Sequence, residues 1–261
     1  MKRILITGAN SYIGDSFVKY LERWPEEYRA DVLDMQNETW ETADFSAYDA
    51  VFHVAGIAHI KETAENAHLY YEVNRDLAAA VAEKAKAEGV NQFVFLSSMS
   101  VYGIEEGEIT GQTPLTPKSN YGKSKLEAEE QLDALRDESF SIVVLRPPMV
   151  YGEGCKGNYQ TLVKLAKLLP VFPAYENRRS MIHIDNLVSF VKNVMDSGAD
   201  GLFLPQDEEY VCTSKMVQEI GRGMGKKICL LKILNPAVAV AKRCTTMGKK
   251  AFGDLVYVKE E

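Results

Sequence analysis

The sequence predicts an α/β protein built around a parallel sheet with helices on both faces. Over the first two-thirds of the chain, short runs of β-branched and aromatic residues alternate with helical stretches, which is the pattern of repeated βαβ units. The chain has 261 residues, 46% of them hydrophobic, which is enough for one substantial core and a small additional lobe.

The elements follow in order along the chain. The expected strands are short and apolar, at Lys2–Thr7, Tyr28–Asp34, Ala50–Ala55, Gln92–Ser97 and Ser141–Arg146. The expected helices lie between them and after the last, at Tyr12–Arg23, Ala64–Glu88, Tyr121–Asp137 and Tyr159–Leu169. The second helix carries an Ala-rich run of high helix propensity, and Gly89 follows it as a C-cap.

Composition excludes several classes of function. A net charge of −7 argues against a nucleic-acid partner, which would require clustered Lys and Arg. The four Cys residues are widely spaced, so we expect no disulfide framework and no metal site, and reduced thiols suit the cytoplasm. The apolar segment Ile233–Ala241 is too short to span a bilayer and contains Pro236; we expect a core-facing helix there and no membrane partner.

The turn after the first strand has the features of a dinucleotide site. Glycine lets the backbone approach a pyrophosphate at the N-terminus of the following helix, and a later glycine lets helix and strand pack closely. Ser11 stands where a third glycine is usual, and a plain strand-to-helix turn is the alternative. The candidate cofactor residues here are Gly8, Asn10, Ser11, Tyr12, Ile13 and Gly14.

Asp34 closes the second strand, where a carboxylate can accept both ribose hydroxyls of NAD. No Lys or Arg occurs from Asp31 through Asp44 to meet a 2′-phosphate, so the segment favours NAD over NADP; a solvated acidic loop is the alternative. Met35 beside Asp34, and the small residues Val54, Ala55 and Gly56 after the third strand, complete this set of expected cofactor contacts.

Tyr121 and Lys125 are four residues apart, so on a helix they share one face. A Lys ammonium beside a phenol stabilises the phenolate and lowers the Tyr pKa, so Tyr121 can take a proton from a hydroxyl as a hydride leaves the same carbon. Ser98 follows a strand and can hold the reacting oxygen. An exposed amphipathic helix face is the alternative for the Tyr–Lys pair alone.

Seven landmarks occur together in order. They are Thr7–Gly14, Phe52–Gly56, Val73–Asn74, Phe95–Gly103, Tyr121–Lys125, Leu145–Gly152 and Met181–Asp185. In this order the chain resembles the NAD-dependent epimerase/dehydratase branch of the extended short-chain dehydrogenases, above all the UDP-hexose 4-epimerases and 4-reductases. The resemblance implies a Rossmann-type doubly wound parallel sheet in residues 1–152 and 177–197, with a small substrate-binding lobe in residues 153–176 and 198–261.

The resemblance also implies roles for individual residues. Ser98, Tyr121 and Lys125 would be catalytic, with Lys125 also bonding the nicotinamide ribose. The remaining cofactor contacts would be Asp44 and Phe45 at the adenine, and Ser97, Pro147 and Val150 near the nicotinamide. The nucleotide sugar would be held by Asn158 and Arg179, with Arg178 a close rival, and His59 would face it from the end of the third strand.

The activity expected is NAD-dependent 4-epimerisation of a UDP-hexose or UDP-N-acetylhexosamine by transient C4 oxidation, with Tyr121 as the base. An NAD(P)H-dependent reductase of a nucleotide-4-keto sugar uses the same three residues, and a non-enzymatic dinucleotide sensor is the remaining alternative. Met99-Ser100 follows Ser98 where sugar dehydratases carry an Asp-Glu pair, which argues against dehydration. A homodimer through the two long helices is expected from the resemblance alone.

Overall fold

The computed structural model describes residues 1–37, 39–58, 60 and 62–259 and divides the chain into two compact units. The first unit comprises Met1–Gly103, Leu115–Pro148 and His183–Pro205, and the second comprises Ile104–Pro114, Met149–Ile182 and Gln206–Glu261. These units differ from the expected domains at four segments: residues 104–114, 149–152 and 177–182 lie in the second unit, and residues 198–205 lie in the first. Residues 104–114 belong to the second unit because strand β5 pairs with β12 there, and residues 198–205 belong to the first because β10 pairs with β6.

The first unit contains a fully parallel sheet of six strands in the order β10-β6-β4-β3-β1-β2. The strands are β1 (Lys2–Thr7), β2 (Tyr28–Leu33), β3 (Ala50–His53), β4 (Gln92–Leu96), β6 (Ser141–Leu145) and β10 (Gly201–Phe203). The five strands expected from the sequence are therefore confirmed to within two residues. The Rossmann-type α/β fold is also confirmed.

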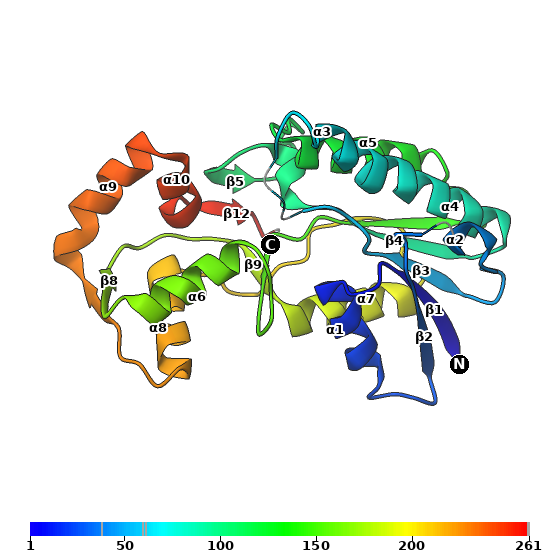
Figure 1. Ribbon diagram of the computed structural model, residues 1–261, viewed down its shortest axis with the longest axis horizontal. Coiled ribbons are helices and arrows are strands. Elements are labelled where there is room, and N and C mark those ends of the chain that lie inside the picture. Colours follow the sequence, from blue (N-terminus) through cyan, green and yellow to red (C-terminus); the bar gives the residue numbers. More distant parts are fainter. Residues whose placement is uncertain (38, 59, 61, 260–261) are drawn as a thin grey trace. The chain divides into compact units, whose positions relative to one another are not determined.

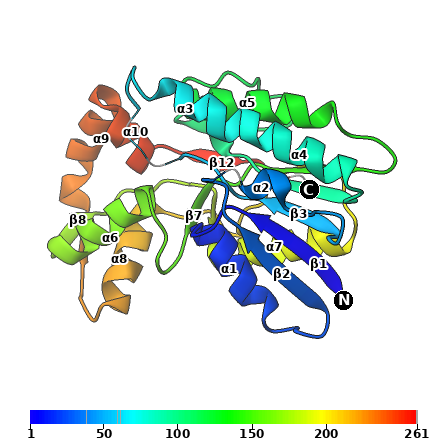
Figure 2. The ribbon, with the colours of Figure 1, turned by 45° about the vertical axis from the view of Figure 1, so that its right-hand side comes forward.

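Helices cover both faces of this sheet. They are α1 (Tyr12–Leu21), α2 (Thr39–Thr42), α3 (Ala67–Tyr71), α4 (Leu77–Ala87), α5 (Asn120–Asp133) and α7 (Ile184–Asp196). Figures 1 and 2 show α3, α4 and α5 on one face and α1 and α7 on the other. The long helix expected at Ala64–Glu88 is α3 and α4 joined by a π-helical turn at Glu72–Asp76. A 3₁₀ turn, Met99–Tyr102, follows β4.

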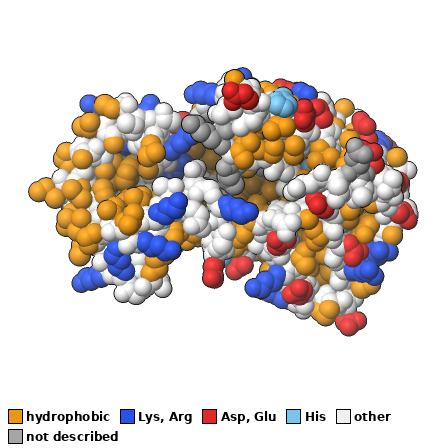
Figure 3. Space-filling view, viewed as in Figure 1, with side chains coloured by type: hydrophobic (Ala, Val, Ile, Leu, Met, Phe, Trp, Pro, Cys, Tyr) orange, Lys and Arg blue, Asp and Glu red, His pale blue; other side chains and the backbone are white. Residues whose placement is uncertain are grey.

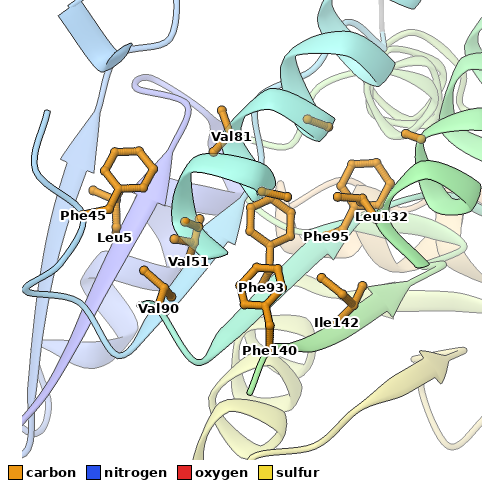
Figure 4. Packing of buried hydrophobic residues seen from close by; sticks show 14 of the residues in the cluster. Leu5, Phe45, Val51, Val81, Val90, Phe93, Phe95, Leu132, Phe140 and Ile142 are labelled. Atoms are coloured by element: carbon orange, nitrogen blue, oxygen red, sulfur yellow. The ribbon is translucent and has the colours of Figure 1, made fainter. Parts of the chain in front are cut away.

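Apolar side chains fill both interfaces between sheet and helices. On the α4 and α5 face, Phe93, Phe95, Phe140 and Leu132 lie together in a fully buried cluster (Figure 4). On the opposite face, the rings of Phe17 from α1 and Phe52 from β3 meet edge to face with centroids 5.3 Å apart. Each fully buried side chain of this size contributes about 1.5–3 kcal/mol, so both faces hold the sheet in register.

The second unit is smaller and built from helices and short strand pairs. Its helices are α6 (Asn158–Leu168), α8 (Thr213–Gly223), α9 (Asn235–Cys244) and α10 (Thr246–Phe252), with a 3₁₀ turn at Lys232–Leu234. Its strands are β5 (Gly107–Ile109), β7 (Met149–Tyr151), β8 (Val171–Pro173), β9 (Met181–His183), β11 (Cys229–Leu231) and β12 (Leu255–Tyr257). The pairs are β5 with β12, β8 with β11, and β7 with β9.

The expectation of a core-facing helix at Ile233–Ala241 is wrong. Within α9 only Val238 is buried, whereas Val240 is 61% exposed and Ile233, just before the helix, is 82% exposed. None of the helices formed by the described residues combines the length and apolar character needed to cross a bilayer.

Candidate active site

The site begins at the carboxyl edge of the sheet, where the strand order reverses. Strand β1 pairs with β2 on one side and β3 on the other, so the chain runs outward in both directions from this point. Such a switch point leaves a crevice beyond the carboxyl ends of the strands, which is where ligands bind in open α/β sheets.

Gly8 sits at this switch point in a conformation that suits glycine. Its φ is +127°, and a Cβ built on it would lie 2.8 Å from the Ala55 amide nitrogen. Its N–H donates to the Leu33 carbonyl at 2.9 Å, while the Ala55 N–H donates to the Thr7 carbonyl at 2.8 Å. The ends of β1, β2 and β3 therefore pack so closely around Gly8 that a side chain there would clash with the chain after β3.

The turn delivers the N-terminus of α1 to the same edge. Asn10 is exposed and has a left-handed backbone with φ of 61°. The Ser11 hydroxyl accepts from the Gly14 N–H at 3.3 Å and caps the helix, which leaves its own O–H able to donate to a ligand. Tyr12 and Ile13 form the first turn of α1 and are half-buried. A Cβ on Gly14 would lie 3.1 Å from side chains of β1 and Val54, which confirms its role in helix–strand packing.

Asp34 is half-buried directly after β2, and its Oδ1 accepts from the Gln36 N–H at 3.0 Å. Its other carboxylate oxygen keeps its acceptor capacity for a sugar hydroxyl. Met35 is half-buried and packs against the core. The carboxylate therefore stands beside the glycine turn, where the sequence places a ribose ligand.

Asp44 and Phe45 have different environments. Hydrogen bonds from the Ser46 side chain and from the Ser46 N–H, which lies 2.9 Å from the Asp44 carboxylate, lower the pKa of Asp44. The Phe45 ring is fully buried in the core, and its N–H donates to Glu88. The expectation that Phe45 covers an adenine is wrong for its side chain, because burial against the sheet leaves no ring surface for a cofactor.

Ser98 and Tyr121 come together from two different elements. Ser98 caps the 3₁₀ turn after β4, and Tyr121 lies in the first turn of α5. A Cβ on Gly122 would lie 2.7 Å from the Ser100 carbonyl, so the absence of a side chain there lets α5 approach the turn. Burial raises the pKa of Tyr121, and a hydrogen bond with Ser98 opposes that rise.

Lys125 is buried on the same face of α5, one turn after Tyr121. Its ammonium donates to the Leu96 carbonyl at 2.9 Å and lies 4.5 Å from the centre of the Phe95 ring. Burial lowers its pKa to about 7, and the charge of Glu129 partly offsets that fall. The expected lowering of the Tyr121 pKa by Lys125 is not found, because desolvation dominates at Tyr121 and Lys125 does not contribute there.

Beneath these residues lies a buried ion pair that the sequence did not indicate. Glu129 and Arg146 are 7% and 6% exposed, and the guanidinium bonds the carboxylate through Nε at 3.1 Å and through Nη2. The Ser97 hydroxyl donates to Glu129, and Arg146 Nη1 donates to the Tyr102 hydroxyl at 3.0 Å. The expectation that Ser97 contacts the cofactor fails for its side chain, which points into this network.

Asn74 holds the segment after β3. It is fully buried in the π-helical turn, and its amide accepts from the Ile57 N–H at 2.8 Å and donates to the Ile57 carbonyl at 3.1 Å. It also donates to the Ser124 hydroxyl on α5 at 3.1 Å. A Cβ on Gly56 would lie 2.9 Å from Asn74 Oδ1 and 3.3 Å from Lys125 Nζ, so this glycine admits both groups.

The other expected residues are divided between the two units. Val54 and Ala55 are buried at the end of β3, and Pro147 is buried after β6 with its carbonyl accepting from the Met99 N–H at 3.0 Å. Val150 lies in β7 of the second unit and is half-buried. His59 lies outside the described residues.

Asn158, Arg178 and Arg179, the residues expected to hold the nucleotide sugar, belong to the second unit. Asn158 is exposed at the start of α6. The half-buried Arg179 donates from Nη1 to the Gly253 carbonyl at 2.9 Å, and burial lowers its pKa. The exposed Arg178 donates to Glu108 at 3.0 Å and lines a hollow of about 380 Å³.

The first unit fits a dinucleotide on its own geometry. The glycine turn at β1 leaves room for close backbone approach, α1 presents its N-terminus, and Asp34 supplies a carboxylate at the end of β2. These groups would hold the pyrophosphate and the adenosine ribose, and Lys125 would serve the second ribose.

Comparison with known proteins agrees with this geometry. The sequence profile of the NAD dependent epimerase/dehydratase family matches residues 4–203. A UDP-glucose 4-epimerase of Vibrio cholerae is 33% identical over 253 residues, covering 86% of this chain and 76% of that one. An N-acetyl-alpha-D-glucosaminyl-diphospho-ditrans,octacis-undecaprenol 4-epimerase of Escherichia coli O157:H7 is 25% identical, covering 96% and 81%. Among solved structures, a UDP-glucuronic acid 4-epimerase from Bacillus cereus in complex with NAD superimposes with a TM-score of 0.72 at 18% identity, covering 87% and 86%.

Proposed function

Because the chain belongs to the NAD-dependent epimerase/dehydratase family, we propose that it interconverts the C4 epimers of a UDP-hexose or UDP-N-acetylhexosamine. The observation that carries the proposal is the placement of Ser98, at the turn after β4, beside the first turn of α5, which carries Tyr121, with Lys125 one helical turn further along. All three lie at the carboxyl edge of a parallel sheet whose glycine turn fits a dinucleotide. The similarity to the Vibrio cholerae UDP-glucose 4-epimerase supports a UDP-linked hexose.

Ser98, Tyr121 and Lys125 have different roles in the proposed proton transfer. When bound, NAD supplies the acceptor and donor of hydride for a transient oxidation at C4. Tyr121 takes the proton of the C4 hydroxyl, and the Ser98 hydroxyl holds the reacting oxygen through a hydrogen bond. Because burial keeps Tyr121 protonated at neutral pH, nearby positive charge must lower its pKa before it acts as a base. Lys125 is the nearest cation on the same helix face.

The candidate ligands of the nucleotide sugar lie in the second unit. Arg suits a diphosphate because its planar guanidinium can donate two parallel hydrogen bonds. In Arg179, Nη1 already donates to the Gly253 carbonyl, so the other nitrogens of the guanidinium would bind the diphosphate. We propose Asn158 and Arg179 as ligands of the nucleotide diphosphate. Substitution of either by Ala should raise the KM for the UDP-sugar more than it lowers kcat.

The test is an epimerase assay on purified protein with UDP-glucose and with UDP-N-acetylglucosamine, without added cofactor. We expect formation of the C4 epimer, and we expect denatured protein to release nicotinamide cofactor in stoichiometric amount. Tyr121→Phe should lower kcat by about 10²–10⁴-fold, the usual contribution of general acid–base catalysis, without changing the cofactor content. Lys123→Met, an exposed substitution on the same helix, is the control.

Two other results would each reject the epimerase. Consumption of added NADH with a nucleotide-4-keto sugar, without interconversion of epimers, would identify a reductase that exchanges its cofactor. Binding of NAD without turnover of either substrate class would identify a dinucleotide sensor. Full epimerase activity in Tyr121→Phe would leave the family assignment intact but would refute the proposed base.

A further inference from the structure

The second unit contains a long basic segment in an otherwise acidic protein. Between Glu219 and Asp254 there are 34 residues without a single Asp or Glu, in a chain whose net charge is −7. The eight basic residues of this segment are Arg222, Lys226, Lys227, Lys232, Lys242, Arg243, Lys249 and Lys250. Half of them, Lys242, Arg243, Lys249 and Lys250, lie in α9 and α10, and Lys232 lies in the 3₁₀ turn just before α9.

The outward side of this pair is apolar. In α9, Pro236, Ala237 and Val240 are exposed at helical spacing, while Val238 is buried on the opposite side. Ile233 before α9 is 82% exposed, and Met247 on α10 is 77% exposed. A helix on the surface of a globular protein normally turns its apolar stripe toward the core. In α9 most of the apolar side chains face outward.

Most of the basic side chains of the segment have no acidic partner. Lys242 lies 3.1 Å from Glu106, and Lys250 lies 3.5 Å from Glu105. Within the part of the chain that the structure describes, Arg222, Lys227, Lys232, Arg243 and Lys249 form no ion pair within 4.0 Å. Figure 3 shows apolar and basic side chains, without acidic ones, along the left edge of the molecule.

We propose that this surface, here called the α9 face (Lys232, Ile233, Val240, Arg243 and Met247), binds the surface of an anionic phospholipid membrane. Exposed apolar side chains flanked by unpaired cations are typical of helices that lie in a bilayer interface, where the apolar groups enter the headgroup region and the cations meet lipid phosphates. A second copy of the chain would bring like charges together at the same face, which disfavours self-association there.

This mode of attachment differs from the one that the sequence excluded. The expectation of no membrane partner rested on the absence of a spanning segment, and a helix lying in the interface needs no such length. Membrane attachment also goes beyond the proposed epimerase reaction, because it depends on residues distant in sequence from Ser98, Tyr121 and Lys125. The two proposals can therefore fail separately.

The test is co-sedimentation of the full chain, with NAD present, with vesicles of phosphatidylcholine alone or of phosphatidylcholine and phosphatidylglycerol in equal parts. We expect binding to the anionic vesicles only. Raising the salt concentration from about 0.1 M to about 1 M, which shortens the Debye length from about 10 Å to about 3 Å, should release the protein.

Two double variants separate the charge from the apolar contribution. Lys232→Glu/Arg243→Glu should weaken binding by at least about thirtyfold, since each basic residue near an anionic surface contributes about 1 kcal/mol and the two carboxylates add repulsion. Ile233→Ser/Val240→Ser should weaken it without changing its salt dependence. The matched controls are Lys19→Glu/Lys118→Glu and Val32→Ser, exposed positions in the first unit, which should bind as the original protein does. Circular dichroism checks that each variant is folded.

The proposal is overturned if anionic vesicles do not sediment the folded protein, or if the control charge variant weakens binding as much as the test variant. It is also overturned if light scattering shows a dimer that Ile233→Ser/Val240→Ser dissociates, because the occupant of the face would then be a second copy. Epimerase activity on a UDP-sugar in Lys232→Glu/Arg243→Glu should stay unchanged in every case.

Discussion

Replacing Lys125 by Met should make the folded protein more stable while removing its activity. Lys125 is 5% exposed, and burial holds its pKa at about 7 against a usual value of 10.5. The unfolded chain therefore binds this proton more tightly than the folded chain does. Each pKa unit between the unfolded and the folded chain corresponds to about 1.4 kcal/mol. Below pH 7 the lowered pKa of Lys125 therefore costs the folded protein at most about 5 kcal/mol of stability.

The sign of the pH dependence follows from the same values. Above the folded pKa of about 7, the folded protein holds Lys125 neutral while the unfolded chain stays charged. The penalty is therefore complete below pH 7 and disappears as the pH rises toward 10.5. Met fills a similar volume without a charge but loses the bond to the Leu96 carbonyl, a charge-assisted bond of about 1.5–3 kcal/mol. We expect a net gain of about 2–3 kcal/mol.

The measurement is urea denaturation of Lys125→Met and of the original protein at pH 6.5 and at pH 9.5. The variant should be more stable at pH 6.5, and its advantage should disappear at pH 9.5, where only about 1.4 kcal/mol of the penalty remains to offset the lost bond. Lys123→Met, an exposed change on the same helix, should show no such pH dependence. The reasoning is refuted if the original protein is the more stable of the two at pH 6.5, or if the difference between them does not depend on pH.

Three further substitutions test other parts of the site. Gly8→Ala should abolish NAD retention and destabilise the fold by about 1–3 kcal/mol, because its Cβ would meet the Ala55 nitrogen at 2.8 Å in a backbone with positive φ; cofactor content and thermal melting check this. Glu129→Gln should cost about 3–5 kcal/mol by leaving Arg146 buried without its counter-ion, and an unchanged melting temperature would contradict it. Asp34→Ser should weaken NAD binding relative to NADP, as measured by fluorescence titration of both reduced cofactors.

The sequence predicted the sheet and the glycine turn after β1 well, because both depend on local patterns. A glycine at positions 8 and 14 can be interpreted directly, since a side chain at either position would crowd the neighbouring strands. The roles of Ser97 and Phe45 could not be predicted, because both residues sit next to site residues in the chain yet point into the interior. Adjacency in sequence does not reveal which face of the sheet a side chain occupies at the end of a strand.

The buried network beneath the site escaped prediction for a different reason. Glu129 lies one turn beyond Lys125 on α5, a spacing that could have indicated a shared face, but its partner Arg146 follows β6, 17 residues later. Pairing of that kind depends on how a helix lies across a sheet. The exposed side of α9 was missed because an apolar run of that length is usually buried. The homodimer stays a prediction.

The π-helical turn at Glu72–Asp76, which joins α3 to α4, carries Asn74 and so fixes the segment after β3. One residue more than a regular helix would need is accommodated there, so deleting a single residue could restore an ordinary helix. The residues on either side would keep their faces, because the wide turn is what absorbs the extra residue, but the backbone inside the turn would change. Asn74 lies inside that turn, so its bonds to Ile57 and Ser124 would be lost, and the segment after β3 would lose the side chain that holds it. Insertions and deletions elsewhere on the surface should be tolerated far better than one in this turn.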